Sequence, residues 1–83
     1  MKTWYVYIVE CSDGSLYTGV TPDITKRIEA HNNGTGAKYT RSRRPVKLAW
    51  AVDAGFKSAA LMLEHHIKSY SRKEKLDLIK EDD

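Results

Sequence analysis

Cysteine and long hydrophobic runs are what this chain of 83 residues most clearly lacks. Its one cysteine, Cys11, cannot form an internal disulfide, which excludes a disulfide-framed fold and favours a reducing compartment such as the cytoplasm. We interpret Cys11 as a buried strand residue, because no nucleophile motif surrounds it. No apolar run approaches membrane length, the N-terminus lacks the pattern of a signal peptide, and no His/Cys/Asp spacing suggests zinc. We therefore expect a cytoplasmic protein with no membrane segment.

The composition is that of a folded chain with an excess of positive charge. A hydrophobic content of 41% argues against disorder, and the length allows a single domain over residues 1–83 with a small core. Three of the eleven acidic residues end the chain, so residues 1–80 carry 14 basic and 8 acidic side chains, a net charge of +6. This balance permits a polyanionic partner such as nucleic acid.

Two adjacent segments predict a β-hairpin. Residues 4–11 and 15–19 are rich in β-branched and aromatic residues, with Asp13-Gly14 between them. The first run is apolar at both parities, which is typical of a central strand covered on both faces. A two-residue turn would put Tyr7 and Tyr17 on opposite faces. We favour a three-residue loop with Gly14 left-handed, which pairs Tyr7 with Gly19, puts both tyrosines on one face and leaves the Tyr7 phenol open to close approach.

The next segment predicts a helix over residues 22–32, with Thr21 as its N-cap and a stop at Asn33-Gly34. The spacing places four residues on its inward stripe: Ile24, Arg27, Ile28 and His31. A cation and an imidazole on a packing face need partners. Either both side chains extend from the edge of the stripe into solvent, or they point into a cleft over the hairpin.

Residues 34–45 predict a loop dense in positive charge. Two glycines, several hydroxyl residues and a closing proline indicate the loop. Its candidate nucleic-acid contacts are Lys38, Tyr39, Arg41, Arg43 and Arg44. Closely spaced cations beside an exposed ring suit phosphate contacts and base stacking, although a plain solvated loop is the alternative.

The rest of the chain predicts one strand and two helices. The strand covers residues 46–53, with Val46, Leu48, Trp50 and Val52 on one face. A helix over residues 57–70 has Phe56, Ala60, Leu63, Ile67 and Tyr70 on its apolar stripe, Glu64 at the border, and His65 and His66 at the surface. A capping box, Ser71 to Glu74, starts a last helix that packs through Leu76 and Ile79 and ends near Lys80 before a frayed acidic tail.

The predicted fold class is therefore α+β, with a three-stranded antiparallel sheet flanked by helices in the order β-β-α-β-α-α.

Two triplets in this order resemble the GIY-YIG nuclease family. Tyr5-Val6-Tyr7 is similar to the GIY triplet, with Tyr5 in place of its glycine, and Tyr17-Thr18-Gly19 is similar to the YIG triplet. The ten-residue step between Tyr7 and Tyr17, Arg27 on the next helix and Glu64 on the later one fit the same pattern. The resemblance covers nearly the whole chain, and the small stand-alone bacterial members are the most similar.

The resemblance implies metal-assisted hydrolysis of a phosphodiester. By resemblance, Glu64 holds one Mg²⁺ or Mn²⁺ ion and Arg27 neutralises charge on the phosphoryl oxygens. Tyr7 would act as general base, for which a nearby arginine or metal must lower its pKa from about 10. Tyr17 would position water or phosphate, and His31 could assist proton transfer.

Two further positions depart from the family pattern. Val20 stands where excision-repair relatives carry lysine, and Leu76 stands in the region where many family nucleases carry asparagine. We therefore keep three hypotheses: a metal-dependent nuclease that favours DNA over RNA, a catalytically weak or inactive GIY-YIG module that binds nucleic acid, and a protein-interaction adaptor. Target choice would rest on the basic loop, on oligomerisation or on a partner protein.

Overall fold

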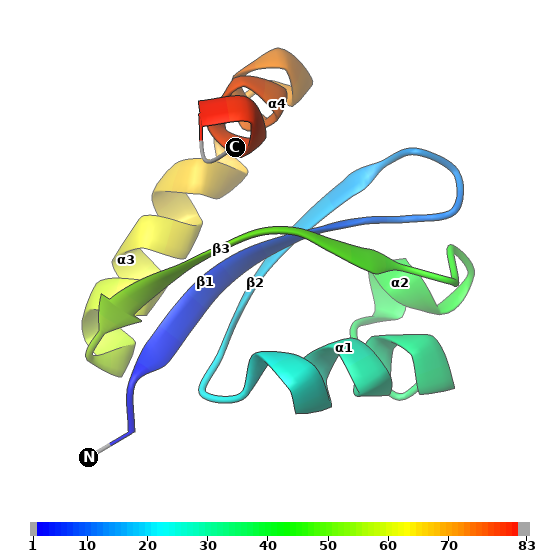
Figure 1. Cartoon of the computed structure of the whole chain (residues 1–83), viewed down its shortest axis with the longest axis horizontal. Helices are drawn as coiled ribbons and strands as arrows, with labels where there is room; N and C mark the ends of the chain where they lie inside the picture. The colour runs from blue at the N-terminus through cyan, green and yellow to red at the C-terminus, as the bar shows by residue number, and fades with distance from the viewer. Residues whose placement is uncertain (1, 82–83) are drawn as a thin grey trace.

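A computed structural model describes residues 2–81 and has three strands and four helices in the order β-β-α-α-β-α-α. They are β1 (Trp4–Glu10), β2 (Leu16–Thr21), α1 (Ile24–Asn33), α2 (Lys38–Arg41), β3 (Lys47–Gly55), α3 (Lys57–Lys68) and α4 (Arg72–Glu81). The antiparallel sheet has the order β2-β1-β3, with α1 and α2 on one side and α3 and α4 on the other (Figure 1). The predicted α+β class is confirmed, and α2 is the one element that the sequence did not predict. Within residues 2–81, no helix is long and apolar enough to cross a membrane.

The hairpin has the register of a three-residue loop. Gly14 has φ 83°, and the amide of Cys11 donates to the carbonyl of Ser15 at 2.9 Å. Tyr7 consequently pairs with Gly19, and Val9 with Tyr17. The two tyrosines share one face of the sheet, as predicted.

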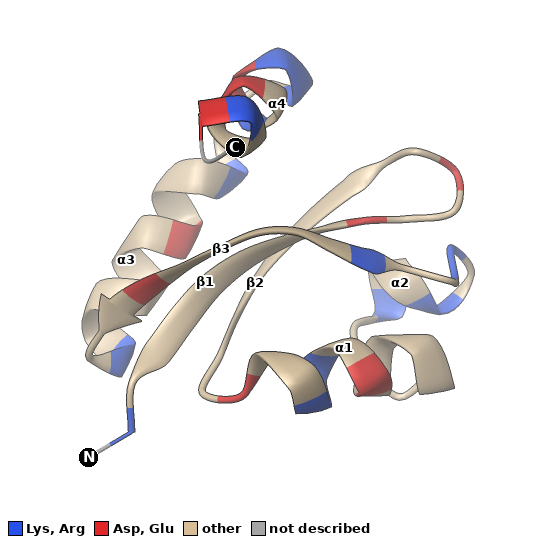
Figure 2. Cartoon of the chain, viewed as in Figure 1, with Lys and Arg blue, Asp and Glu red and all other residues tan. Residues whose placement is uncertain are grey.

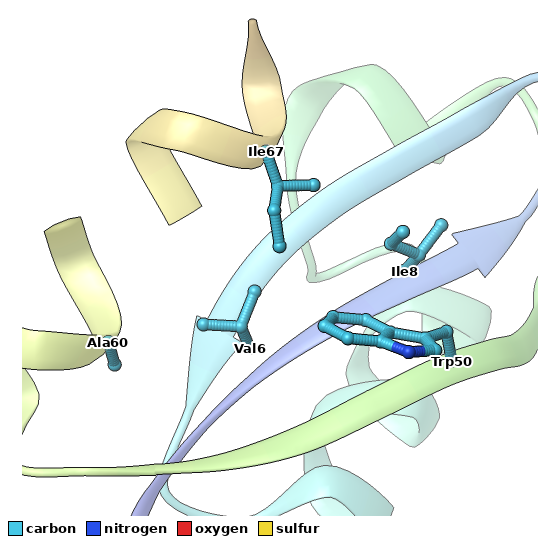
Figure 3. Close-up of a cluster of buried hydrophobic side chains, with 5 residues drawn as sticks. All are labelled: Val6, Ile8, Trp50, Ala60 and Ile67. Atoms are coloured by element: carbon cyan, nitrogen blue, oxygen red, sulfur yellow. The ribbon is translucent and has the colours of Figure 1, made fainter. Parts of the chain in front are cut away.

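Strand β1 is central, and each of its faces has its own core. Val6 and Ile8 contact Trp50 of β3 and Ala60 and Ile67 of α3 (Figure 3). On the opposite face, the buried cluster consists of Tyr7, Val9, Cys11 and Val46, with Tyr17, Ile24, Ile28 and Ala51 packed against it. Cys11 is buried, as expected. The doubly apolar first strand therefore separates two small cores.

A register shift in β3 makes one predicted face wrong. Ile8 pairs with Trp50 and Val9 with Leu48, so that Ala49 is the extra residue of an irregular ladder. A bulge of this kind reverses side-chain parity. Trp50 therefore packs with the α3 side, whereas Val46 joins the Tyr7 side.

Several predicted helix boundaries and contacts also differ. Asp23, not Thr21, is the N-cap of α1: its carboxylate accepts from the amide of Lys26, while the Thr21 hydroxyl takes part in a turn with Asp23. Helix α3 ends at Lys68 and not near residue 70. Phe56 lies outside the core at 65% exposure, since it precedes the first turn of α3.

The last helix begins as predicted but packs differently. Ser71 and Glu74 form the capping box through two hydrogen bonds of 3.0 and 3.1 Å. Leu78 and Ile79 pack against the core, whereas Leu76 is exposed. The expected fraying of the acidic tail concerns mainly residues 82–83, which lie outside the described residues.

Candidate active site

Four of the five predicted catalytic residues meet on one face of the sheet. Tyr7 comes from β1, Tyr17 from β2, and Arg27 and His31 from consecutive turns of α1. The rings of Tyr7 and Tyr17 lie 5.8 and 5.5 Å from the His31 ring, each edge-on to it. The inward stripe of α1 thus points over the hairpin, as one of the two interpretations of that stripe predicted.

Hydrogen bonds connect these residues in a line. The Tyr7 hydroxyl oxygen lies 2.8 Å from Nε2 of His31, and Nε of Arg27 donates to that oxygen at 3.3 Å. On the other side of the imidazole, Nδ1 lies 2.7 Å from Oγ1 of Thr40, a buried residue of α2. The line runs Arg27–Tyr7–His31–Thr40, and its last three members have no exposed surface.

Burial changes the protonation expected for this cluster. It raises the pKa of Tyr7 above its ordinary value, and the hydrogen bond and charge of Arg27 oppose that effect only in part. Burial, and to a smaller degree the charge of Arg27, lowers the pKa of His31. Both rings are therefore neutral near pH 7. Arg27 lowers the pKa of Tyr7, as expected, but desolvation outweighs its effect, so the net shift is upward.

The space beside Gly19 is filled by Tyr7 itself. A Cβ atom on Gly19 would lie only 2.5 Å from the Tyr7 hydroxyl oxygen. The prediction that glycine leaves the phenol open to approach is therefore wrong here, since Tyr7 has no exposed surface. Arg27 is half-buried and donates to the phenol oxygen.

Part of the predicted basic loop packs against the cluster instead of extending into solvent. The Tyr39 ring stacks on Tyr17 at 5.8 Å, and the guanidinium of Arg43 lies 3.9 Å above the Tyr39 ring. Arg43 also pairs with Asp13 of the hairpin loop at 3.1 Å. These contacts brace the ring of Tyr17 from outside. They also occupy one stacking ring and one cation among the predicted nucleic-acid contacts.

The other cations of this segment remain at the surface. Figure 2 shows Lys and Arg gathered along α2 and the stretch that leads to β3. A hollow of about 470 Å³ is lined by Arg41, Arg44, Asn32, Ser42 and Pro45. Arg44 donates to the carbonyls of Arg41 and Asn32. Within residues 2–81, the side chains of Lys38 and Arg41 have no hydrogen bond or ion pair.

Glu64 comes from a different helix and makes a separate ion pair. It belongs to α3, which packs on the opposite face of the sheet, and its carboxylate pairs with Lys68 at 3.3 Å. Its charge is close enough to contribute to the raised pKa of Tyr7, as the smallest of the causes. No hydrogen bond or ion pair of the described chain joins it to the other four, so its link to them in this structure is through its charge on Tyr7.

The donor set around Glu64 suits only some metal ions. Among residues 2–81, no group of three His, Cys, Asp or Glu side chains could hold a metal. A zinc site needs three or four protein ligands and does not fit. Mg²⁺ keeps several waters and is held by one or two carboxylates plus substrate phosphates. Glu64, with 17% of its side chain exposed, fits that chemistry.

Thr40 and Gly36 are the site residues that the sequence did not reveal. Thr40 accepts or donates at His31, and a Cβ on Gly36 would lie 2.5 Å from Nδ1 of His31. Both belong to the stretch Gly-Ala-Lys-Tyr-Thr-Arg, residues 36–41. The positive charge of this stretch predicted contacts with nucleic acid, whereas its glycine and its threonine lie against the imidazole of His31.

Comparison with known proteins gives consistent results along the chain. Residues 3–77 match the GIY-YIG catalytic domain. UPF0213 proteins from Staphylococcus saprophyticus and Staphylococcus aureus are 57% and 56% identical over 81 residues, which cover 98% of this chain and 99% of each relative.

Two solved structures are similar in fold. The solution NMR structure of a UPF0213 protein from Bacillus halodurans has a TM-score of 0.61 at 45% identity, covering 94% of this chain and 83% of that one. The solution NMR structure of a protein from E. faecalis has a TM-score of 0.65 at 38% identity, covering 96% and 85%.

Proposed function

Because this chain belongs to the GIY-YIG catalytic-domain family, we propose that it is a divalent-metal-dependent nuclease that hydrolyses phosphodiester bonds, with DNA favoured over RNA. The observation that carries the proposal is the hydrogen-bonded line of Arg27, Tyr7 and His31 beneath Tyr17. A cation, a phenol and a neutral imidazole in contact are the groups that phosphate binding and proton transfer require.

Arg27 is the residue that meets the phosphate. Arg27 is half-buried, and among the described residues its guanidinium makes one hydrogen bond, to the phenol oxygen of Tyr7. A phosphate offers stronger, charge-assisted hydrogen bonds than a neutral phenol. When Arg27 turns to the phosphate, it uncovers the Tyr7 hydroxyl and removes a nearby positive charge from His31.

Tyr7 and His31 then move a proton together. Tyr7 takes a proton from the attacking water as its own proton passes to Nε2 of His31, which lies 2.8 Å away. The water oxygen forms the new bond to phosphorus as the bond to the leaving oxygen breaks. This relay needs no free tyrosinate, which the raised pKa of Tyr7 makes unfavourable. The departure of Arg27 removes one of the two causes that hold the pKa of His31 down.

Glu64 is the residue that would hold the ion. When bound there, Mg²⁺ or Mn²⁺ would polarise the phosphate and stabilise the leaving oxygen. Glu64 must give up its ion pair with Lys68, which is half exposed and can turn to solvent. Tyr17 lies beside His31 and is partly exposed, so that its hydroxyl is placed to orient water or phosphate.

Nucleic acid would be held next to this face by exposed cations. Lys38, Arg41 and Arg44 are exposed, and the last two line the hollow beside α2. Tyr39 is exposed and Arg43 is partly exposed, and their contacts at the surface also brace Tyr17. Phosphate contacts by a few such side chains give binding that weakens steeply with salt.

A second candidate function is a nucleic-acid-binding module that cuts weakly or not at all. Two observations favour it: Tyr7 and His31 have no exposed surface, and the carboxylate of Glu64 is paired with Lys68. In this function the cations beside α2 bind nucleic acid, and no phosphodiester bond is hydrolysed.

A cleavage assay separates the two functions. Labelled single-stranded, duplex, flapped and branched DNAs, and RNA, are incubated with Mg²⁺ or Mn²⁺ and with wild type, Glu64→Ala or Tyr7→Phe. The control variants are Glu29→Ala, an exposed acid of α1, and Tyr5→Phe, on the same strand as Tyr7. If the protein is a nuclease, Glu64→Ala and Tyr7→Phe lose cleavage and the two control variants keep it. Binding without cleavage by wild type supports the module, and equal cleavage by all variants would refute the assigned site.

A further inference from the structure

We propose that Thr40 is a positioning residue that holds His31 in the tautomer whose Nε2 accepts the proton of Tyr7. The use of this tautomer in catalysis rests on the proposed function, whereas the tautomer itself follows from the hydrogen bonds alone. Thr40 is buried, lies on α2 and touches neither the Tyr7 hydroxyl nor Arg27 through a hydrogen bond.

The direction of the hydrogen bonds is set at the Thr40 end. The Thr40 hydroxyl lies 2.9 Å from the carbonyl oxygen of Ala37, and a carbonyl can only accept. The single hydroxyl proton of Thr40 is therefore used in that bond. Its oxygen, 2.7 Å from Nδ1 of His31, must accept, so Nδ1 of His31 carries a proton.

The other end of the line agrees with this assignment. Nε of Arg27 can only donate, so the phenol oxygen of Tyr7 accepts from it. The phenol proton is then free to point at Nε2 of His31. A neutral imidazole protonated at Nδ1 has its lone pair at Nε2. Every donor in the line thus meets one acceptor, with a short contact of 2.7 or 2.8 Å on each side of the ring.

The opposite tautomer would leave hydrogen-bonding groups mismatched on both sides of the ring. With a proton on Nε2, the phenol oxygen of Tyr7 would accept from both His31 and Arg27, and the phenol proton would lose its acceptor in a buried space. The lone pair of Nδ1 would then face the oxygen of Thr40, whose own proton is bound to Ala37. Leaving a buried donor without a partner is unfavourable. The ring has no room to flip, because Gly36 lies against it so closely that a Cβ there would be 2.5 Å from Nδ1.

The short helix α2 therefore has a task beyond carrying positive charge. It begins after Ala37, whose carbonyl accepts the hydrogen bond of the Thr40 hydroxyl. Thr40 is buried, while Lys38 and Arg41 remain exposed. The same turn of backbone presents the imidazole with an acceptor and nucleic acid with cations. Orientation of a base by a third group is a general requirement of proton-transfer sites.

Two substitutions of Thr40 isolate its hydroxyl. Thr40→Val keeps the branched shape but removes the acceptor, and Thr40→Ser keeps the acceptor. The tautomer of His31 is read from the ring nitrogens of ¹⁵N-histidine-labelled protein by NMR, with His31→Gln identifying the signals. We expect protonated Nδ1 in wild type and in Thr40→Ser, and a shift toward protonated Nε2 in Thr40→Val. Protonated Nε2 in wild type would overturn the proposal, and this result does not depend on whether the Thr40 variants fold.

Cleavage rates test the use of the tautomer. Loss of an oriented general base lowers a rate by about 10²-fold or more, so Thr40→Val should lose cleavage on that scale at unchanged substrate affinity, and Thr40→Ser should restore it. Equal rates for Thr40→Val and wild type would refute the positioning role. If wild type does not cleave, the nuclease proposal fails, while the NMR result still decides whether Thr40 sets the tautomer.

Discussion

Gly19 lies directly against the phenol of Tyr7, so a single added methyl group should displace that ring. A Cβ atom at Gly19 would lie 2.5 Å from the hydroxyl oxygen, 2.7 Å from Cζ and 3.0 Å from Cε2 of Tyr7. Ordinary van der Waals contact begins at 3.4 Å, so the oxygen must move by about 0.9 Å. A movement of that size takes the oxygen out of its 2.8 Å hydrogen bond with His31.

The expected loss of stability comes from two sources. Overpacking of a tight core lowers the free energy of unfolding by about 1–3 kcal/mol. A broken hydrogen bond between two buried groups lowers it by a further 1–3 kcal/mol or so. We therefore expect Gly19→Ala to destabilise the fold by about 2–6 kcal/mol, out of a total of about 4–12 kcal/mol for a domain of this size.

Urea unfolding followed by circular dichroism measures this loss. With a slope near 1 kcal/mol per molar urea for a small domain, the midpoint should fall by about 2 M or more. Gly14→Ala is the matched control, because Gly14 has φ +83° but nothing within 4 Å of an added Cβ. Its left-handed backbone should cost alanine about 1–2 kcal/mol and leave the His31 ring signals unchanged. A loss below about 1 kcal/mol for Gly19→Ala, with unchanged His31 signals, would refute the packing of Tyr7 over Gly19.

Three further predictions concern other parts of the molecule. Because burial lowers the pKa of His31, the free energy of unfolding should fall as pH drops below about 6.5, and His31→Gln should remove this dependence above pH 5 or so; parallel curves in urea would contradict it. Replacing Arg41 and Arg44 together by glutamine should weaken DNA binding and reduce the slope of log affinity against log salt by up to about 2, and an unchanged slope would exclude both as phosphate contacts. Ile67→Ala should cost about 2–5 kcal/mol in urea unfolding, since Ile67 is buried, whereas Leu61→Ala, at a position 44% exposed, should cost clearly less; equal losses would contradict the core assignment.

Features set by neighbouring residues were predictable. The hairpin register follows from Gly14, which adopts the left-handed conformation that a three-residue loop needs. The end of α1 follows from Gly34, which has φ 82°. The start of α4 follows from the capping box of Ser71 and Glu74. In each case the deciding hydrogen bonds join residues within a few positions of each other.

Features that depend on an extra or shifted residue were not predictable. The alternation in residues 46–53 suggested one apolar face, but the irregular ladder at Ala49 sends Trp50 and Val46 to opposite sides of the sheet. A bulge arises from pairing with the neighbouring strand, and alternation within one strand contains no information about it. The N-cap of α1 also differs from the prediction. Thr21 and Asp23 are both residue types that cap helices, and the hydroxyl of Thr21 is used in a turn with Asp23, so Asp23 is the cap.

The candidate site also has a part that the sequence predicted and a part that only the structure shows. Tyr7, Tyr17, Arg27 and His31 could be brought together from the sequence alone, because hairpin register and helix period place each of them on a face. Burial then decided their chemistry, since it raises the pKa of Tyr7 against the influence of Arg27.

Which groups complete the site was decided only when distant segments met. Thr40 reaches His31 because residues 34–45 fold back over α1, and Arg43 reaches Asp13 across 30 positions of sequence. Glu64 pairs with Lys68 on α3, which covers the opposite face of the sheet, and its charge still acts on Tyr7. Local patterns determine which way a side chain points from its own strand or helix, whereas contacts between elements depend on how the whole chain packs its two cores around β1.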